Sequence, residues 1–290
     1  MAPLAAPDLT GLPMILRSWS FDPLVIIGLG LGSRWYLRAL HRLRGSGGGW
    51  PRWRSRCFFA GIAVLALALL SPLDVYSDLL LSVHMVQHLL LTMAAPPLLL
   101  LGSPLTLALR TTRDRAALLK LLNGRAIHVV TAPVLGWLLF VGTLWASHLP
   151  AFYDATIRHV LLHAAEHLAY VATALLFWRP VVGGDPSPVR LSHPARILAL
   201  FLFMPQATFL GLAIYGSDRA LYAPYVATSR LLGTTAVGDQ HLAGAIMWAA
   251  GMFFMVPAMV LVLVDWMRTD EREAVRADAR LDRAEANRGG

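Results

Sequence analysis

The chain has 290 residues, of which 57% are hydrophobic and 14% are charged, and its mean hydropathy is +0.57. This composition excludes an ordinary soluble protein and indicates that lipid surrounds most of the chain. The net charge of +8 does not indicate a nucleic-acid partner, because almost every arginine lies in a segment beside an apolar run, where membrane topology explains it.

Several apolar runs approach the ~20 residues that a helix needs to cross ~30 Å of hydrocarbon. They predict transmembrane helices at 22–40, 57–73, 79–101, 127–147, 157–178, 195–215 and 240–264. The expected fold is therefore all-α, a polytopic membrane bundle of about seven helices over residues 22–265. Residues 1–21 are expected to form an extracytoplasmic segment. Residues 266–290 are expected to form a basic cytoplasmic tail that is an exposed helix or disordered.

The orientation follows from the basic residues, because lysine and arginine stay on the cytoplasmic side of a membrane. Segments 38–56, 102–127 and 179–196, together with the tail from Trp266, hold 20 of the 25 basic residues. These segments follow alternate expected helices. The N-terminus is therefore expected outside and the C-terminus inside.

This orientation places most of the histidines at one depth. Seven of the ten histidines lie in the outer halves of the expected helices, namely His84, His88, His148, His159, His163, His167 and His241. Cys57 is the only cysteine, which excludes a disulfide within the chain, a Cys-x-x-Cys pair and a thiolate-rich metal site. A metal would therefore need histidine, methionine or carboxylate ligands.

Two pairs of histidines have the spacing that puts side chains on one face of a helix. His84-Met-Val-Gln-His88 is one pair and His163-Ala-Ala-Glu-His167 is the other, with Glu166 on the face of the second pair. His159 extends that pair by one turn. Ionisable groups in a membrane usually face the bundle interior and mark functional sites, so the pairs predict a metal or haem site. A purely structural polar network is the alternative.

Three chemistries compete for such a site. His163-Ala-Ala-Glu-His167 fits the H-x-x-E-H pattern of inverted zinc proteases, although no third ligand or substrate cleft can be identified. Haem requires an axial pair, whereas four histidines and a glutamate fit a compact metal site better. Copper, with zinc as the less favoured ion, suits a His-rich site in a non-reducing compartment. Met85, or the methionines at 252, 255 and 259, would become relevant if the ion is Cu(I).

Several segments resemble one family in order along the chain. The matching blocks are Ser71-Pro-Leu-Asp74, the stretch from Ser82 to Leu91, Ala95-Pro-Pro-Leu98 with Gly102-Ser-Pro104, His163 to His167, Phe177-Trp-Arg-Pro-Val181 and Asp239 to Trp248. Together they resemble the CtaG-type cytochrome c oxidase assembly factors associated with caa-type oxidases. The resemblance covers roughly residues 20–265 and leaves out the basic tail.

The resemblance implies a multi-pass protein of the bacterial inner membrane that is not an enzyme. It would support metallation of a haem-copper oxidase, with an oxidase subunit and the lipid bilayer as partners and copper as the cargo. The positions that match the family are His84, His88, His163, Glu166, His167 and Asp239. His241 belongs to the last block but is the less secure ligand. A haem-binding membrane redox protein and a metal or proton transporter are the alternative functions.

Overall fold

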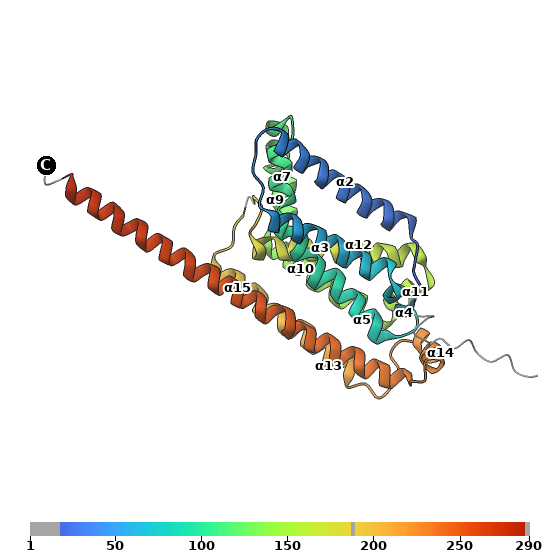
Figure 1. Cartoon of the computed structure of the whole chain (residues 1–290). Coiled ribbons are helices and arrows are strands. Elements are labelled where there is room, and N and C mark those ends of the chain that lie inside the picture. The colour runs from blue at the N-terminus through green and yellow to red at the C-terminus, as the bar shows by residue number, and fades with distance from the viewer. Residues whose placement is uncertain (1–17, 187–188, 288–290) are drawn as a thin grey trace, which may run out of the picture.

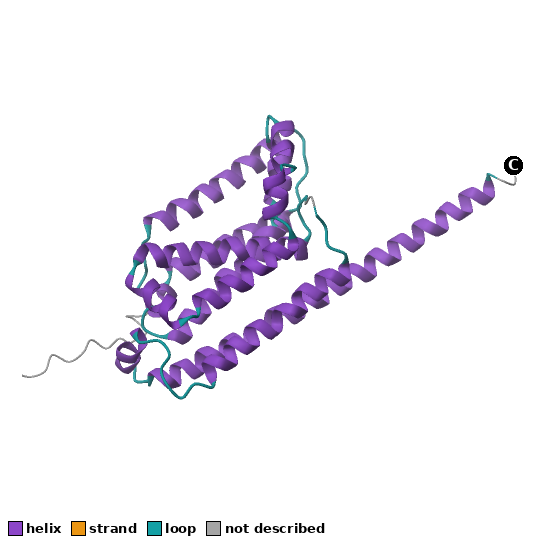
Figure 2. Ribbon diagram, turned by 180° about the vertical axis from the view of Figure 1, so that it is seen from behind, coloured by secondary structure: helices purple, strands orange, loops and turns teal. Residues whose placement is uncertain are grey.

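A computed structural model describes residues 18–186 and 189–287 of the chain (Figure 1). Within these ranges the protein contains helices and loops and no β-strand, as Figure 2 shows, so the expected all-α class is confirmed. The expected segment 1–21 lies largely outside the described residues. The longest helix, α15, runs along the bundle beside α13 and continues well beyond it (Figure 1).

The helices divide into long ones that build the bundle and short ones that connect them. In chain order they are α2 (Pro23–Gly45), α3 (Arg52–Leu70), α4 (Pro72–Ser77), α5 (Leu81–Leu89), the π-helix η1 (Leu90–Ala94), α6 (Ala95–Leu101), α7 (Pro104–Thr111), α8 (Arg115–Leu122), α9 (Arg125–Val130), α10 (Pro133–Ser147), α11 (Pro150–Arg158), α12 (Val160–Val182), α13 (His193–Tyr215), α14 (Pro224–Leu231) and α15 (Ala236–Ala286).

Five helical stretches of the described chain are long and apolar enough to cross a membrane. They are Arg52–Leu70, Leu81–Thr111, Val160–Val182, His193–Tyr215 and Ala236–Arg280. Helices α10 and α11, which bend by 82° at their junction, make a sixth if they form one broken span. Helix α2 is long enough, but Arg34, Arg38, Arg42 and Arg44 make its second half polar. The membrane class is supported, while the count of seven and the orientation stay predictions.

The expected helix 127–147 is interrupted in the structure. Helix α9 ends at Val130 and α10 begins at Pro133, with Ala132 in an extended conformation between them. The interruption has a local cause, because proline lacks an N–H group and disfavours the helical conformation of the residue before it. At the other end of the chain the expected boundary after residue 264 does not appear, since α15 continues as one helix through most of the basic tail.

A second proline effect ties two long helices together. Pro96 in α6 cannot donate a hydrogen bond to the carbonyl of Thr92, four residues earlier, and the chain passes through the π-helix η1 just before it. The indole N–H of Trp178 in α12 donates to that carbonyl at 2.9 Å. A transmembrane helix tolerates proline when a neighbour satisfies the freed carbonyl in this way. The bond fixes η1 against α12, so the helical stretches that carry the two histidine pairs are held together.

The main core lies where α10, α12 and α13 meet. The ring of Phe140 stacks on those of Phe177 and Phe203, with centroids 4.9 and 5.0 Å away, and all three side chains are buried. Helices α13 and α15 are in close contact at Gly211 and Gly244, where a Cβ on Gly244 would lie 2.6 Å from the Gly211 carbonyl oxygen. Small residues permit this kind of close backbone contact between membrane helices.

Candidate metal centre

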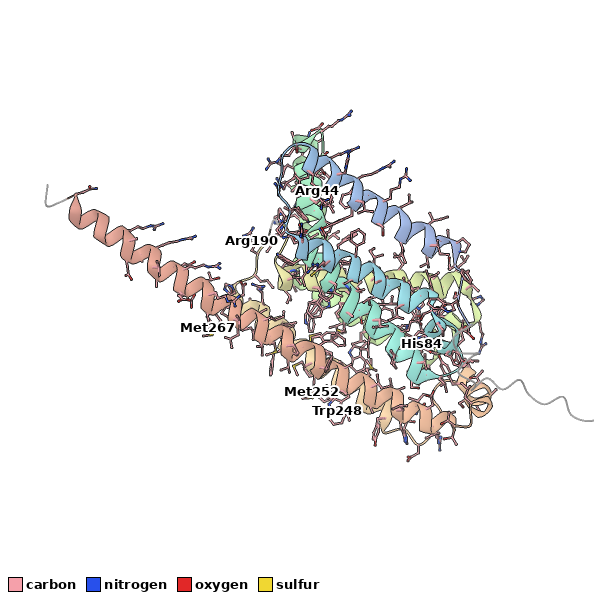
Figure 3. All side chains as sticks on the ribbon, in the orientation of Figure 1. Arg44, His84, Arg190, Trp248, Met252 and Met267 are labelled. Atoms are coloured by element: carbon pink, nitrogen blue, oxygen red, sulfur yellow. The ribbon has the colours of Figure 1, made fainter. Side chains whose placement is uncertain are left out.

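The two histidine pairs lie opposite each other between α5 and α12. Within each pair the ring centroids are 4.0 Å apart for His84 and His88 and 4.3 Å apart for His163 and His167. Across the helices, His84 lies 6.0 Å from His163, and His88 lies 5.7 Å from His167. Figure 3 shows His84 inside the bundle, toward the end that carries α4, α11 and α14. We call these four residues the four-histidine cluster.

The cluster has buried nitrogen atoms with no hydrogen-bond partner among the described residues. Both ring nitrogens of His84 and His88 are in this state, as is Nε2 of His163 and of His167. His84 and His88 are almost completely buried, at 1% and 5% exposure. A buried polar group without a partner costs ~1–3 kcal/mol, so the donor set fits an ion that these nitrogens would coordinate.

Glu166 is a buried carboxylate on α12, between His163 and His167 in the sequence. Its side chain is buried, and neither carboxylate oxygen accepts a hydrogen bond from the described part of the chain. The nearby Thr156 hydroxyl does not satisfy it, because its single proton is donated to the Tyr153 carbonyl at 2.8 Å. If it faces the cluster, its charge would offset that of a bound ion.

Three of the residues expected at the site lie elsewhere. The exposed residue His159 precedes the first residue of α12. His241 packs against the ring of Tyr215, with centroids 5.2 Å apart, and its Nε2 lies 3.3 Å from the carbonyl oxygen of Ser217. Asp239 accepts hydrogen bonds from the backbone N–H of Leu81 at 2.6 Å and of Ser82 at 3.3 Å.

Asp239 therefore has a structural role in the described fold. The first N–H groups of a helix lack partners within that helix, and its carboxylate on α15 satisfies two of them at the start of α5. The Ser82 hydroxyl also donates to it. Asp239 thus fixes the start of the helix that carries His84 and His88, and the candidate ligands narrow to the four-histidine cluster and Glu166.

The expected methionine stripe on α15 is also divided. Trp248 and Met252 are 44% and 50% exposed and project from the bundle (Figure 3), whereas Met255 is fully buried. Within residues 18–186 and 189–287, no group of three or more His, Cys, Asp or Glu side chains is placed so that it could hold a metal ion. An ion shared by several of the rings would therefore require their side chains to move.

The structure adds His148 and two tyrosines to the surroundings of the cluster. The His148 ring lies 6.5 Å from that of His88, while Tyr153 lies 5.1 Å from His84 and Tyr170 lies 4.4 Å from His88. The sequence placed His148 at the same depth but gave no reason to treat it as a ligand. Tyr170 follows His167 by three residues, so helical spacing was a usable signal for it.

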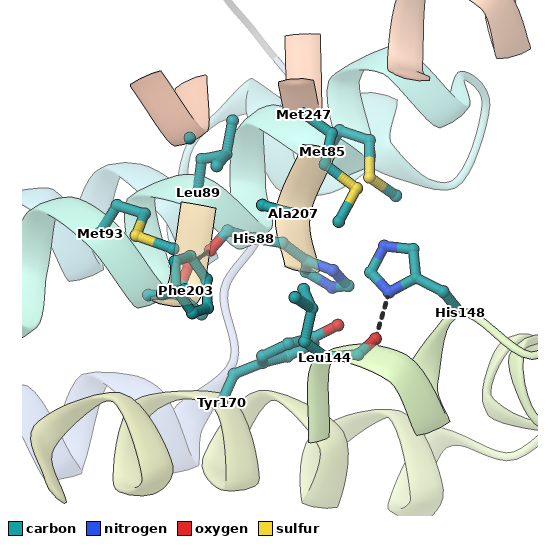
Figure 4. A pocket seen from close by; sticks show the side chains of 12 residues that line it. Met85, His88, Leu89, Met93, Leu144, His148, Tyr170, Phe203, Ala207 and Met247 are labelled. Carbon is teal, nitrogen blue, oxygen red and sulfur yellow. Dashed lines mark hydrogen bonds between the residues drawn. The ribbon is translucent and has the colours of Figure 1, made fainter. Parts of the chain in front are cut away.

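A small cavity of about 30 Å³ lies beside His88 and His148 (Figure 4). Its wall includes Met85, Met93, Met247 and Tyr170, and the rest is mainly apolar. Helix α4 packs against α5, and Oδ1 of Asp74 in α4 accepts a hydrogen bond from Nε2 of Gln87 at 2.8 Å. Burial raises the pKa of the Asp74 carboxyl. Asp74 is therefore partnered within the fold.

Comparison with known proteins agrees with the resemblance of the sequence blocks. Uncharacterized proteins of Mycobacterium leprae and Mycobacterium bovis are each 31% identical to the chain, over 277 and 283 residues. These matches cover 91% and 92% of this chain but only 42% of each relative, so the chain spans about two-fifths of the length of these curated relatives. No solved structure matches the chain. Residues 34–269 match the family described as cytochrome c oxidase caa3 assembly factor (Caa3_CtaG), and the chain belongs to that family.

Proposed function

We propose that this protein is a non-enzymatic assembly factor that holds copper at the four-histidine cluster and supplies it to a haem-copper oxidase subunit. The family membership supports the assembly role. The observation that carries the copper role is the set of buried imidazole nitrogens without hydrogen-bond partners in the described structure, on two helices that face each other. Imidazole is a common ligand for copper, and neighbouring thioethers extend the choice to Cu(I).

The membrane topology expected from the basic residues predicts the depth of this site in the membrane. In that orientation the cluster lies in the outer half of the bacterial inner membrane, close to the compartment where thiols are not kept reduced. The membrane position suits transfer to a partner that is itself embedded in the bilayer. Haem is the less favoured ligand, because the cavity of about 30 Å³ beside the cluster is large enough for an ion but much smaller than a porphyrin.

The test measures copper and oxidase activity with the same variants. His84→Ala/His88→Ala and His163→Ala/His167→Ala are each expected to lower the amount of copper that co-purifies with the protein, and to lower oxidase activity in membranes of cells that depend on it. His159→Ala is the matched control, since His159 is exposed and outside the cluster. The thermal unfolding midpoint in detergent verifies that each variant is folded.

The outcomes separate the competing functions. Full copper content in the quadruple alanine variant would overturn the site. A Soret band in the spectrum of the purified protein would replace copper by haem, and metal uptake into proteoliposomes would favour a transporter. Copper loss with unchanged oxidase activity would overturn the proposed link between copper and assembly.

A further inference from the structure

We propose that the cavity beside His88 is a Cu(I) site formed by Met85, His88, His148 and Met247. We call it the thioether pocket. The inference rests on the proposed function in taking copper as the cargo, and it adds the valence of the ion and a second position for it. All four side chains are buried, with exposures of 2%, 5%, 6% and 5% in that order.

His148 is oriented as a ligand by its own backbone. Its Nδ1 lies 2.7 Å from the carbonyl oxygen of Leu144, and a carbonyl can only accept a hydrogen bond (Figure 4). The proton of the neutral ring is therefore on Nδ1, which leaves Nε2 with a free lone pair. Nε2 is buried and has no hydrogen-bond partner in the described chain. Histidines that bind metals commonly donate their other ring N–H to a backbone carbonyl in this manner.

Three parts of the fold bring the four ligands together. Met85 and His88 are three residues apart on α5, His148 follows the last residue of α10, and Met247 comes from α15. Figure 4 shows the two thioethers directed toward the His148 ring, with the His88 ring beside it. The cavity of about 30 Å³ exceeds the ~10–15 Å³ needed for a particle the size of a water molecule.

The residues that line the pocket favour an ion that is soft and carries a single charge. Thioethers are soft ligands that favour Cu(I), and imidazole binds it as well. Leu144, Phe203 and Ala207 complete an apolar wall, and no carboxylate of the described chain lines the cavity. The cost of burying a charge rises with the square of that charge, so four neutral ligands in this wall suit a monovalent ion better than Cu(II) or Zn(II).

His88 belongs to both positions, which gives the ion a route between them. Its ring lies 5.7 Å from His167 in the four-histidine cluster and 6.5 Å from His148 in the thioether pocket. An ion that stays bound to His88 can release its ligands in the four-histidine cluster and take up those of the thioether pocket, or the reverse. Copper stays as Cu(I) throughout this exchange, so no electron donor is needed.

The test is an anaerobic titration of the purified protein in detergent with Cu(I), in competition with a chromogenic Cu(I) chelator. Met85→Leu and Met247→Leu are each expected to lower the Cu(I) affinity at least ~10-fold, because leucine keeps the volume but removes the sulfur ligand. His148→Ala should show a loss of similar size. Met252→Leu is the matched control and should leave the affinity unchanged, because Met252 is 50% exposed on α15.

X-ray absorption at the copper edge provides a second readout. The wild-type protein should show sulfur scatterers, and Met85→Leu/Met247→Leu should show nitrogen and oxygen scatterers only. Unchanged affinity and an unchanged sulfur signal in this double variant would overturn the thioether pocket, even if His84→Ala/His163→Ala still abolished copper binding. If the His84→Ala/His163→Ala variant instead bound as many Cu(I) ions per chain as the wild type, while the methionine variant bound fewer, the four-histidine cluster would fail and the pocket would stand.

Discussion

The imidazole rings of His84 on α5 and His163 on α12 lie nearly parallel, with centroids 6.0 Å apart and an angle of 14° between their planes. One helical turn further along both helices, the rings of His88 and His167 lie 5.7 Å apart and nearly perpendicular, at 87°. The two pairs are therefore in register across the helix interface. A ligand that binds between the helices would contact residues of both.

This register predicts strong coupling between His84 and His163. If both rings bind one ion, the first alanine substitution removes most of the binding free energy that depends on the pair, and the second adds little. A double-mutant cycle on copper affinity should therefore give a coupling energy of about 1–3 kcal/mol. The same cycle with His84 and the exposed His159 should give none. Additive effects for His84 and His163 would show that the rings do not share an ion.

Asp239 is predicted to act on stability and leave metal binding intact. Its carboxylate accepts the backbone N–H groups of Leu81 and Ser82 at the start of α5, so Asp239→Ala leaves both without this partner. The loss should be roughly 1.5–3 kcal/mol of unfolding free energy, the range for hydrogen bonds to charged groups. The measurement is the thermal midpoint in detergent together with the copper content per folded chain.

The control for this substitution is Asp218→Ala, which removes an exposed carboxylate from the loop before α14. Its thermal midpoint should equal that of the wild type. Copper loss in a fully folded Asp239→Ala protein would contradict the structural role and return Asp239 to the list of ligands.

Gly244 is predicted to be required for the contact between α13 and α15. An alanine Cβ there would lie 2.6 Å from the Gly211 carbonyl oxygen and 2.7 Å from the Tyr215 backbone nitrogen, and neither backbone atom can move aside without shifting its helix. Gly244→Ala should therefore destabilise the protein by about 1–3 kcal/mol, which is typical of overpacking. The fraction of monodisperse protein after heating in detergent measures the effect.

Gly142→Ala is the matched control on α10. Apart from the adjacent backbone of α10 itself, no described atom lies within 4 Å of a Cβ added at Gly142. Alanine also has a higher helix propensity than glycine. This variant should be as stable as the wild type or more so. Equal stability of the Gly142 and Gly244 variants would show that α13 and α15 are not held in close contact.

The sequence predicted the helical class, the approximate places of the long helices and the two histidine pairs. These features depend on local properties, since apolar length, proline positions and spacing of four residues act within one segment. It also indicated that His148 lies at the depth of the pairs. It did not predict the break before Pro133, because a hydropathy window does not register a local break. It left open whether the basic tail is a helix or disordered, because a polar continuation of a helix has no hydropathy signal, and the structure shows the helix.

The sequence by itself determined which residues can share a helix face, because the 3.6-residue period sets the direction of each side chain on its own helix. Only the tertiary structure decided which faces meet. It brought His84 opposite His163 and assigned Asp239 to the start of α5, and it joined Met85 and Met247 beside His148. These contacts depend on the register of packed helices. That register arises from features such as the glycine contact of α13 with α15 and the bond from Trp178 to the Thr92 carbonyl, which link residues far apart in the chain.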